Sequence, residues 1–253
     1  MNHARALPIV PPPDDTRDHV AEEVYSTLVA VSSPLPATLD LRPRLRPVRD
    51  QGTTSTCAAQ VAACIKEYQE LHDTGHASDF SPQFVYYHRE NAPTAGMHGR
   101  DVMRILYTIG TPSEASYRFG SRAAPTASAI QEAGRYRIAE YARVQTMSAL
   151  KTALVEDGPC YIAFPVYNYG LRMWKPAAGE QRSGGHAMTV VGYTKAGFII
   201  RNSWGTDWGA DGYCTYLYED FGAHWDIWTT VDREGSRRPP PPPKRMRLCC
   251  VTI

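Results

Sequence analysis

Cys57 is the first residue whose type and position could do chemistry. It follows three hydroxyl residues at 54–56, and the apolar residues between 57 and 71 recur with the period of a helix. Hydroxyl side chains are common N-caps, so we expect Cys57 in the first turn of a core helix. The positive end of the helix dipole would favour its thiolate, the form that attacks carbonyl groups. A small buried cysteine without a chemical role is the alternative for this residue taken alone.

A histidine and an asparagine in the second half of the chain could serve this cysteine. His186 follows two glycines and begins a strand-like segment, and Asn202 ends the next such segment. The turn at 195–197 predicts a hairpin that brings Asn202 to within a few residues of the position opposite His186. The asparagine amide could there fix the orientation and the tautomer of the imidazole. For His186 taken alone, a hydrogen-bonded core histidine is the alternative.

The elements that must position these residues change in character along the chain. Helical periodicity comes early, at 55–72, at 100–110 and less clearly at 127–140. Strand-like segments come late, at 160–168, 186–193, 198–202 and 212–217. This segregation predicts an α+β protein in which a mainly helical N-terminal lobe faces an antiparallel β lobe across a cleft. Cys57 and His186 would meet across that cleft.

Three blocks of sequence resemble the papain and cathepsin family of cysteine peptidases. They are Gln51-Gly52 shortly before Cys57, GGHAMTVVGY around His186 and RNSWGTDWGADGY around Asn202. Their order also agrees, since the histidine of this family lies about 130–150 positions after the cysteine. Shorter matches at Leu35-Pro36, Ser81-Pro82-Gln83 and Gly158-Pro159 extend the resemblance to residues 35–232. It implies a papain-like two-lobe fold over that range.

The resemblance also implies a function, that of a cysteine-type endopeptidase, or thiol protease. Cys57 would be the nucleophile that forms a thioester, His186 its acid-base partner, and Asn202 the residue that orients the histidine. Gln51 would stabilise the oxyanion together with the backbone N–H of Cys57, and Trp204 would shield the histidine–asparagine hydrogen bond. The substrate would be a protein or a peptide, and no metal or organic cofactor would be needed.

By the same resemblance, two groups of small residues would bind the substrate. The first is a loop that stands where the family has glycines that pair with the substrate backbone: Gly96, Met97, His98 and Gly99. The second would line the main specificity pocket and leave room for a bulky apolar side chain: Ala163, Gly185 and Ala187.

The chain departs from the family pattern beside the nucleophile. Thr54 and Ala58 stand where the family usually has a cysteine and a tryptophan, and Thr111 stands where many relatives have a cysteine. The usual disulfide cysteines are therefore missing, which fits folding in a reducing compartment. An inactive papain-like scaffold that binds peptides and an acyltransferase that uses the same residues are the alternative functions.

Composition and charge argue against nucleic-acid binding, a membrane span, secretion and a zinc site. The chain has 253 residues, 43% of them hydrophobic, so it can bury a sizeable core. Its net charge of +1 favours no nucleic-acid partner. It shows no apolar run long enough for a membrane span, no secretory signal and no zinc-ligand spacing. We therefore expect an intracellular, cytoplasmic monomer without a bound metal.

The two ends differ in composition from this domain. Residues 1–34 are rich in proline and charge, and we expect either a short plug across the cleft or a disordered arm. Residues 233–253 form a proline-rich basic tail that ends in Cys250-Val251-Thr252-Ile253, a loose prenylation motif, with Cys249 as a second lipid site. A lipidated tail would associate with an anionic membrane through its basic residues. A disordered tail, a nuclear address or a ligand for polyproline-binding domains are the alternatives.

Overall fold

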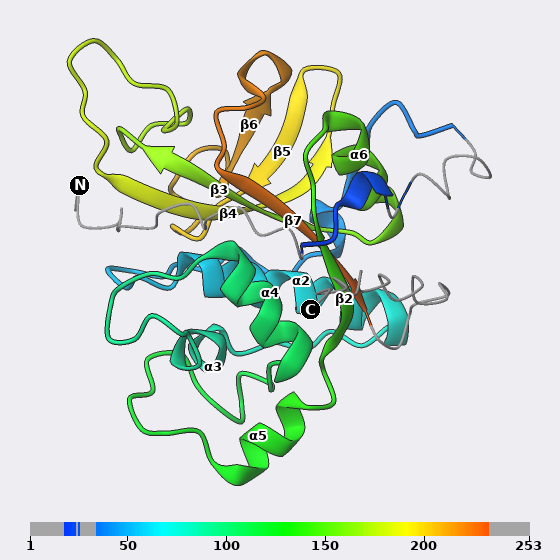
Figure 1. Cartoon of the computed structure of the whole chain (residues 1–253), viewed down its shortest axis with the longest axis vertical. Coiled ribbons are helices and arrows are strands. Elements are labelled where there is room, and N and C mark those ends of the chain that lie inside the picture. The colour runs from blue at the N-terminus through cyan, green and yellow to red at the C-terminus, as the bar shows by residue number, and fades with distance from the viewer. Residues whose placement is uncertain (1–17, 24, 26–33, 233–253) are drawn as a thin grey trace, which may run out of the picture.

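The protein consists of a helical lobe and a β lobe that pack against each other (Figure 1). The computed structural model describes residues 18–23, 25 and 34–232. The helical lobe is built from α2 (Cys57–Thr74), α3 (Pro82–Tyr87), α4 (Gly99–Thr108) and α5 (Ala127–Ala133). The β lobe contains the sheet and α6 (Met147–Glu156). This α+β architecture confirms the expected fold class.

The sheet of the β lobe is antiparallel throughout. Its strands lie in the order β2-β7-β3-β4-β5-β6, and β1 pairs with β4. The strands are β1 (Leu39–Asp40), β2 (Ile138–Arg143), β3 (Cys160–Val166), β4 (Gly184–Tyr193), β5 (Gly197–Arg201), β6 (Tyr213–Leu217) and β7 (Asp226–Asp232). Two short 3-10 helices lie at Arg42–Arg44 and Tyr218–Asp220, and residues 21–23 and 25 are also helical.

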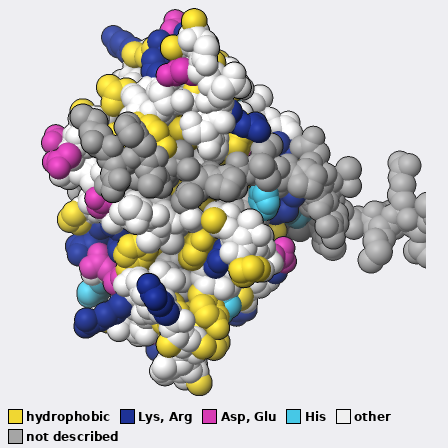
Figure 2. All heavy atoms as spheres, turned by 90° about the vertical axis from the view of Figure 1, so that its left-hand side faces the viewer, with side chains coloured by type: hydrophobic (Ala, Val, Ile, Leu, Met, Phe, Trp, Pro, Cys, Tyr) yellow, Lys and Arg dark blue, Asp and Glu magenta, His cyan; other side chains and the backbone are white. Residues whose placement is uncertain are grey.

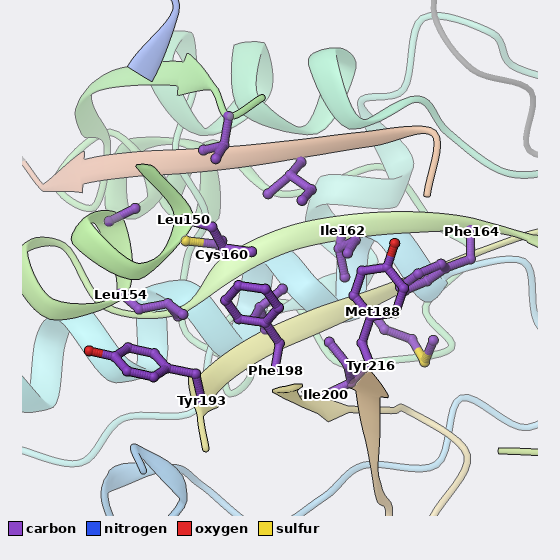
Figure 3. Packing of buried hydrophobic residues seen from close by; sticks show 14 of the residues in the cluster. Leu150, Leu154, Cys160, Ile162, Phe164, Met188, Tyr193, Phe198, Ile200 and Tyr216 are labelled. Carbon is purple, nitrogen blue, oxygen red and sulfur yellow. The ribbon is translucent and has the colours of Figure 1, made fainter. Parts of the chain in front are cut away.

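The central strand β3 is buried on both faces, which explains its unbroken apolar sequence. Side chains alternate between the faces of a strand. Cys160, Ile162 and Phe164 point into the core of the β lobe, where they pack with Leu150 and other residues (Figure 3). Tyr161 and Ala163 instead join an apolar cluster that includes residues of α2 and α4. One strand therefore contributes to the β-lobe core and to the contact between the lobes.

Helix α2 occupies the centre of the molecule. It contacts β4, β3, α3 and α4, and its residues from Cys57 to Gln69 are buried. It ends at Gly75, whose φ of 74° is left-handed and whose N–H donates to the Leu71 carbonyl at 3.0 Å. Thr56 is the N-cap residue, but its side chain caps no helix N–H and instead hydrogen-bonds to the Thr54 hydroxyl at 2.7 Å.

One element expected from the sequence is shorter than predicted. The helical pattern at 127–140 gives a helix only as far as Ala133, which is followed by Gly134. The chain then enters β2 at Ile138 and pairs with β7. At residues 138–140, pairing with β7 therefore outweighs the local helical pattern of the sequence.

The described residues before position 26 pack against both lobes. Asp18 forms an ion pair with Arg100 of α4 at 2.5 Å. Glu22 accepts hydrogen bonds from the backbone N–H groups of Gln145 and Thr146, at 3.0 and 2.7 Å, and so holds the chain just before α6 begins. Tyr25 is 2% exposed within the β-lobe core. This segment is therefore part of the packed structure.

Several expectations concern residues outside the described part of the chain. They are residues 1–17, 24 and 26–33 of the arm or plug expected at 1–34, and the lipidation of Cys249 and Cys250 in the tail. No helix among the described residues is both long and apolar enough to cross a membrane. On the face shown in Figure 2, basic and acidic side chains are interspersed.

Gly99 sits where α4 meets the sheet. A Cβ atom at this position would lie 2.7 Å from the Tyr161 ring, 2.8 Å from the Asp226 carboxylate and 2.9 Å from the Trp228 ring. These distances are shorter than real Cβ contacts allow. Tyr161 and Trp228 are fully buried, so neither ring can move away without disturbing the contact between the lobes.

We expect Gly99→Ala to lower the free energy of unfolding by about 1–3 kcal/mol because of this overpacking. Gly134→Ala is the matched control. Gly134 has φ of −60°, and a Cβ atom there would lie 3.5 Å from the Gln131 carbonyl oxygen, an ordinary contact distance. This second change should therefore stabilise the fold by about 0.5 kcal/mol or have no effect. Urea denaturation of both variants measures the difference. Equal stabilities would show that α4 does not depend on a glycine at position 99.

Candidate active site

His186 and Asn202 form a buried hydrogen-bonded pair. His186 is the third residue of β4, and Asn202 follows the end of β5. The Nε2 atom of His186 lies 2.7 Å from Oδ1 of Asn202. The same oxygen accepts the backbone N–H of Ser203 at 2.7 Å, and this interaction identifies it as the oxygen of the amide. Nε2 of His186 must therefore carry a proton, which leaves Nδ1 of the neutral ring as the basic nitrogen.

Cys57 lies beside this pair. The backbone N–H of Ala187, the residue after His186, donates a hydrogen bond to the Cys57 thiol. Cys57, Ala163 and Ala187 also share one apolar cluster. Nδ1 of His186 is buried and has no hydrogen-bond partner within the described part of the chain. The fold thus brings the first turn of α2 and the start of β4 together, as the sequence predicts.

Burial determines the charge of this pair. Desolvation raises the pKa of the Cys57 thiol to about 11, against the opposing effect of three backbone N–H groups. Desolvation also lowers the pKa of His186 to about 4, although its hydrogen bond to Asn202 acts in the other direction. Both groups are therefore neutral at pH 7 in this structure. The thiolate expected from the helix dipole is not favoured here, because that dipole contributes only about 1 kcal/mol.

Gln51 is held in place by both lobes. Its Nε2 donates to the Thr54 carbonyl at 2.7 Å, and its Oε1 accepts the Ser203 hydroxyl at 2.7 Å. The Gln51 backbone N–H also donates to the Ser203 carbonyl at 2.9 Å. One hydrogen of the Gln51 amide remains for a further acceptor. Ser203 is a residue that the sequence analysis missed, although it directly follows Asn202.

Trp204 covers the histidine. Its ring centroid lies 4.4 Å from that of His186, and its side chain is 4% exposed. Trp208 packs edge-on against Trp204, and Tyr169 packs on it at a tilt. These aromatic rings lower the local dielectric constant around the hydrogen bond between His186 and Asn202.

Of the residues expected to bind substrate, three belong to the same apolar cluster as Cys57. Met97, Ala163 and Ala187 share its apolar cluster, and Ala163 is the cross-strand partner of Ala187. Gly185 is opposite Pro165. In the loop before α4, Gly96 has φ of 80°, His98 is the N-cap residue and Gly99 begins the helix.

Two large residues that the sequence analysis missed occupy the same region. Tyr161 lies on the same face of β3 as Ala163, and Trp228 on β7 is the cross-strand partner of Tyr161. Both rings belong to the cluster with Met97 and Ala187. The space beside Ala163 is therefore smaller than the sizes of the neighbouring alanine and glycine residues suggest.

Comparison with known proteins identifies the family. A family model described as papain family cysteine protease matches residues 35–227. The chain belongs to this family. It is 30% identical to cathepsin K of Gallus gallus over 203 residues, which is 72% of this chain and 59% of that protein. It is 25% identical to cysteine proteinase 3 of Entamoeba histolytica over 204 residues, which is 76% of this chain and 66% of that protein.

The fold agrees with this assignment. Xylellain, a cysteine protease from Xylella fastidiosa, superimposes with a TM-score of 0.78 at 26% identity, over 90% of this chain and 97% of that chain. The papain-like two-lobe fold is thereby confirmed. The chain spans less than two thirds of the length of the curated relatives named above. Among the described residues, no group of three or more His, Cys, Asp or Glu side chains is arranged to hold a metal ion.

We expect Ser203→Ala to lower kcat about tenfold and to leave KM nearly unchanged. The change removes the hydroxyl that holds Gln51, so the amide of Gln51 becomes free to rotate away from a developing oxyanion. Hydrolysis of a fluorogenic peptide measures both constants. Ser183→Ala is the control, since Ser183 is exposed and lies only three residues before His186. A wild-type kcat for Ser203→Ala would contradict the proposed role of this hydroxyl.

The pKa of His186 predicts a loss of stability on acidification. Its value of about 4 lies below the ordinary value of about 6.5, so the unfolded chain takes up this proton first as the pH falls. The free energy of unfolding should therefore fall by up to about 3 kcal/mol between pH 6.5 and 4 on account of this residue.

In His186→Gln this fall should be smaller by that amount. Part of the fall remains, because burial also lowers the pKa of His224 to about 4. Urea denaturation at pH 4 and pH 7 compares the two chains. The same pH dependence in both would show that His186 takes up its proton equally in the folded and unfolded states.

Proposed function

We propose that this protein is a cysteine-type endopeptidase that hydrolyses peptide bonds through a thioester on Cys57. The observation that carries this proposal is the orientation of His186. Its Nε2–H is fixed by Asn202, so its basic Nδ1 is free to accept a proton, and the Cys57 thiol lies against the next residue of β4. Membership of the papain family supports the same chemistry.

The first half of the reaction would be acylation. Nδ1 of His186 takes the thiol proton as the Cys57 sulfur attacks the peptide carbonyl carbon. The negative charge that develops on the carbonyl oxygen is stabilised by the free N–H of Gln51 and by the backbone N–H of Cys57. His186 then gives its proton to the leaving amine as the C–N bond breaks, and the acyl group remains on sulfur.

The second half would be hydrolysis of the thioester. His186 takes a proton from a water molecule, whose oxygen attacks the acyl carbon. The C–S bond breaks, and the proton returns to the Cys57 sulfur. During both halves Asn202 accepts the Nε2–H of the imidazolium, and Trp204 keeps water away from that hydrogen bond.

We also propose that the protein works in a reducing compartment. Its four described cysteines, Cys57, Cys64, Cys160 and Cys214, are buried as free thiols. Free thiols in these positions support a site of action where thiols stay reduced.

A thiol-directed epoxide tests the nucleophile. We expect it to label the wild-type chain once, at Cys57, and to abolish peptide hydrolysis in parallel. Cys57→Ala should lose both labelling and hydrolysis, whereas Cys214→Ala should keep both, since Cys214 is a buried thiol on β6 that belongs to the core of the β lobe and not to the cluster of Cys57. Intact-mass spectrometry and a fluorogenic peptide give the two readouts.

The outcomes separate the proposed function from the alternatives. Correct folding without labelling or hydrolysis would indicate a peptide-binding scaffold. Labelling together with transfer of the acyl group to an added amine, in preference to water, would indicate an acyltransferase. Hydrolysis that persists in Cys57→Ala would rule out the proposed nucleophile.

A further inference from the structure

A small cavity lies behind the catalytic residues, where α2 meets β4 and the end of β5. Its volume is about 10 Å³. Gln60 and Glu67 of α2 form one side, and Asn202 and Ser203 form the other. Water-sized cavities in proteins have about this volume. The cavity therefore has room for one small molecule between the helix that carries the nucleophile and the residue that orients the histidine.

Three buried polar atoms around this cavity have no hydrogen-bond partner among the residues that the structure describes. They are Oε1 of Gln60, Oε2 of Glu67 and Nδ2 of Asn202. The three residues expose 5%, 2% and 2% of their surface. Leaving such a buried atom unpaired is unfavourable, so a shared hydrogen-bond partner would be favoured. The set consists of one donor and two acceptors.

The other polar atoms of these side chains are already engaged. Oδ1 of Asn202 accepts from His186 and from Ser203, so only Nδ2 remains. Oε1 of Glu67 accepts from Arg49 at 2.6 Å and from the Phe80 N–H at 3.2 Å. These bonds fix the amide and the carboxylate in place.

Gln60 lines the same cavity. Its Nε2 donates to the Thr56 hydroxyl at 3.4 Å, which leaves Oε1 without a partner. It lies one helical turn after Cys57 on α2. The charged and titratable groups that line the cavity with it are Arg49, Cys64, Glu67 and Arg201.

We propose that Gln60 is a positioning residue which, with Glu67, holds one water molecule against the side-chain amide of Asn202. The water accepts the Nδ2–H of Asn202 and donates its two hydrogens to Oε1 of Gln60 and Oε2 of Glu67. Three hydrogen bonds are typical for a buried water. The bridge keeps the Asn202 amide from rotating, and so keeps its oxygen on Nε2 of His186. This role rests on the proposed peptidase function.

A pair of matched variants tests the role. Gln60→Met removes the acceptor and keeps the length of the side chain. Gln69→Met is the control, because Gln69 is 4% exposed on the same helix, also has an unpaired Oε1, and lies outside the cavity. Its Nε2 donates to Thr230 at 3.2 Å, so both changes remove one buried hydrogen bond.

We expect Gln60→Met to lower kcat about fivefold with KM within twofold of wild type. The acid limb of its kcat/KM profile should move to lower pH, because a loosened Asn202 stabilises the imidazolium less. Gln69→Met should keep the wild-type kcat and pH profile, even if its melting temperature changes. If both variants change kcat and the acid limb equally, or if Gln60→Met changes neither, the positioning role is wrong.

A crystal structure of the wild-type chain supplies a readout that does not depend on activity. We expect density for one water within hydrogen-bonding distance of Gln60, Glu67 and Asn202. Hydrolysis by a wild-type chain without this water would overturn the bridge and leave the proposed function intact. A wild-type chain with the water but without hydrolysis would overturn the proposed function and the positioning role with it.

Discussion

The site depends on the orientation of one amide group. The backbone N–H of Ser203 holds the oxygen of Asn202, and that oxygen in turn holds Nε2–H of His186. A flipped amide would present an N–H to Nε2 and stabilise the other tautomer of the imidazole. The tautomer of His186 thus follows from a hydrogen bond made by the main chain just after β5. Ser203 also fixes Gln51 through its hydroxyl, so one residue orients both the proposed base and, through Gln51, the proposed oxyanion donor.

Close packing between the lobes sets where these groups meet. The apolar face of β3 and β7 presses against α2 and α4, and this contact contains Cys57 itself. Dense packing keeps the thiol and the imidazole dry, which shifts both groups toward their neutral forms. In the proposed reaction the thiolate and the imidazolium would form only during catalysis, so the resting site does not carry the desolvation penalty of a permanent ion pair. Among the buried charged side chains of α2, Glu67 is paired with Arg49.

The sequence predicted the fold class and the approach of the first turn of α2 to the start of β4, because both depend on patterns that are local in the chain or shared by the family. The helix at 127–140 was predicted too long, since the pairing of β2 with β7 depends on a partner almost a hundred residues away. Tyr161 and Gln60 gave no signal of their own. Tyr161 is an aromatic residue in an apolar strand, and it cannot be told from any other core residue until the facing lobe is known. Gln60 is a glutamine within a helix, and its role becomes visible only once its neighbours across the cavity are known.

The segment at 18–25 shows that the folded unit is longer than the part recognised by family resemblance. The family match begins at residue 35, yet Asp18 binds the helical lobe while Glu22 and Tyr25 bind the β lobe. These contacts join the two halves on the side where β2 and α6 meet. A chain trimmed to the family boundary would keep the motifs around Cys57, His186 and Asn202, and it would lose the Glu22 hydrogen bonds before α6 and a core tyrosine. For expression and crystallisation, boundaries drawn from motifs alone would therefore cut into the hydrophobic interior.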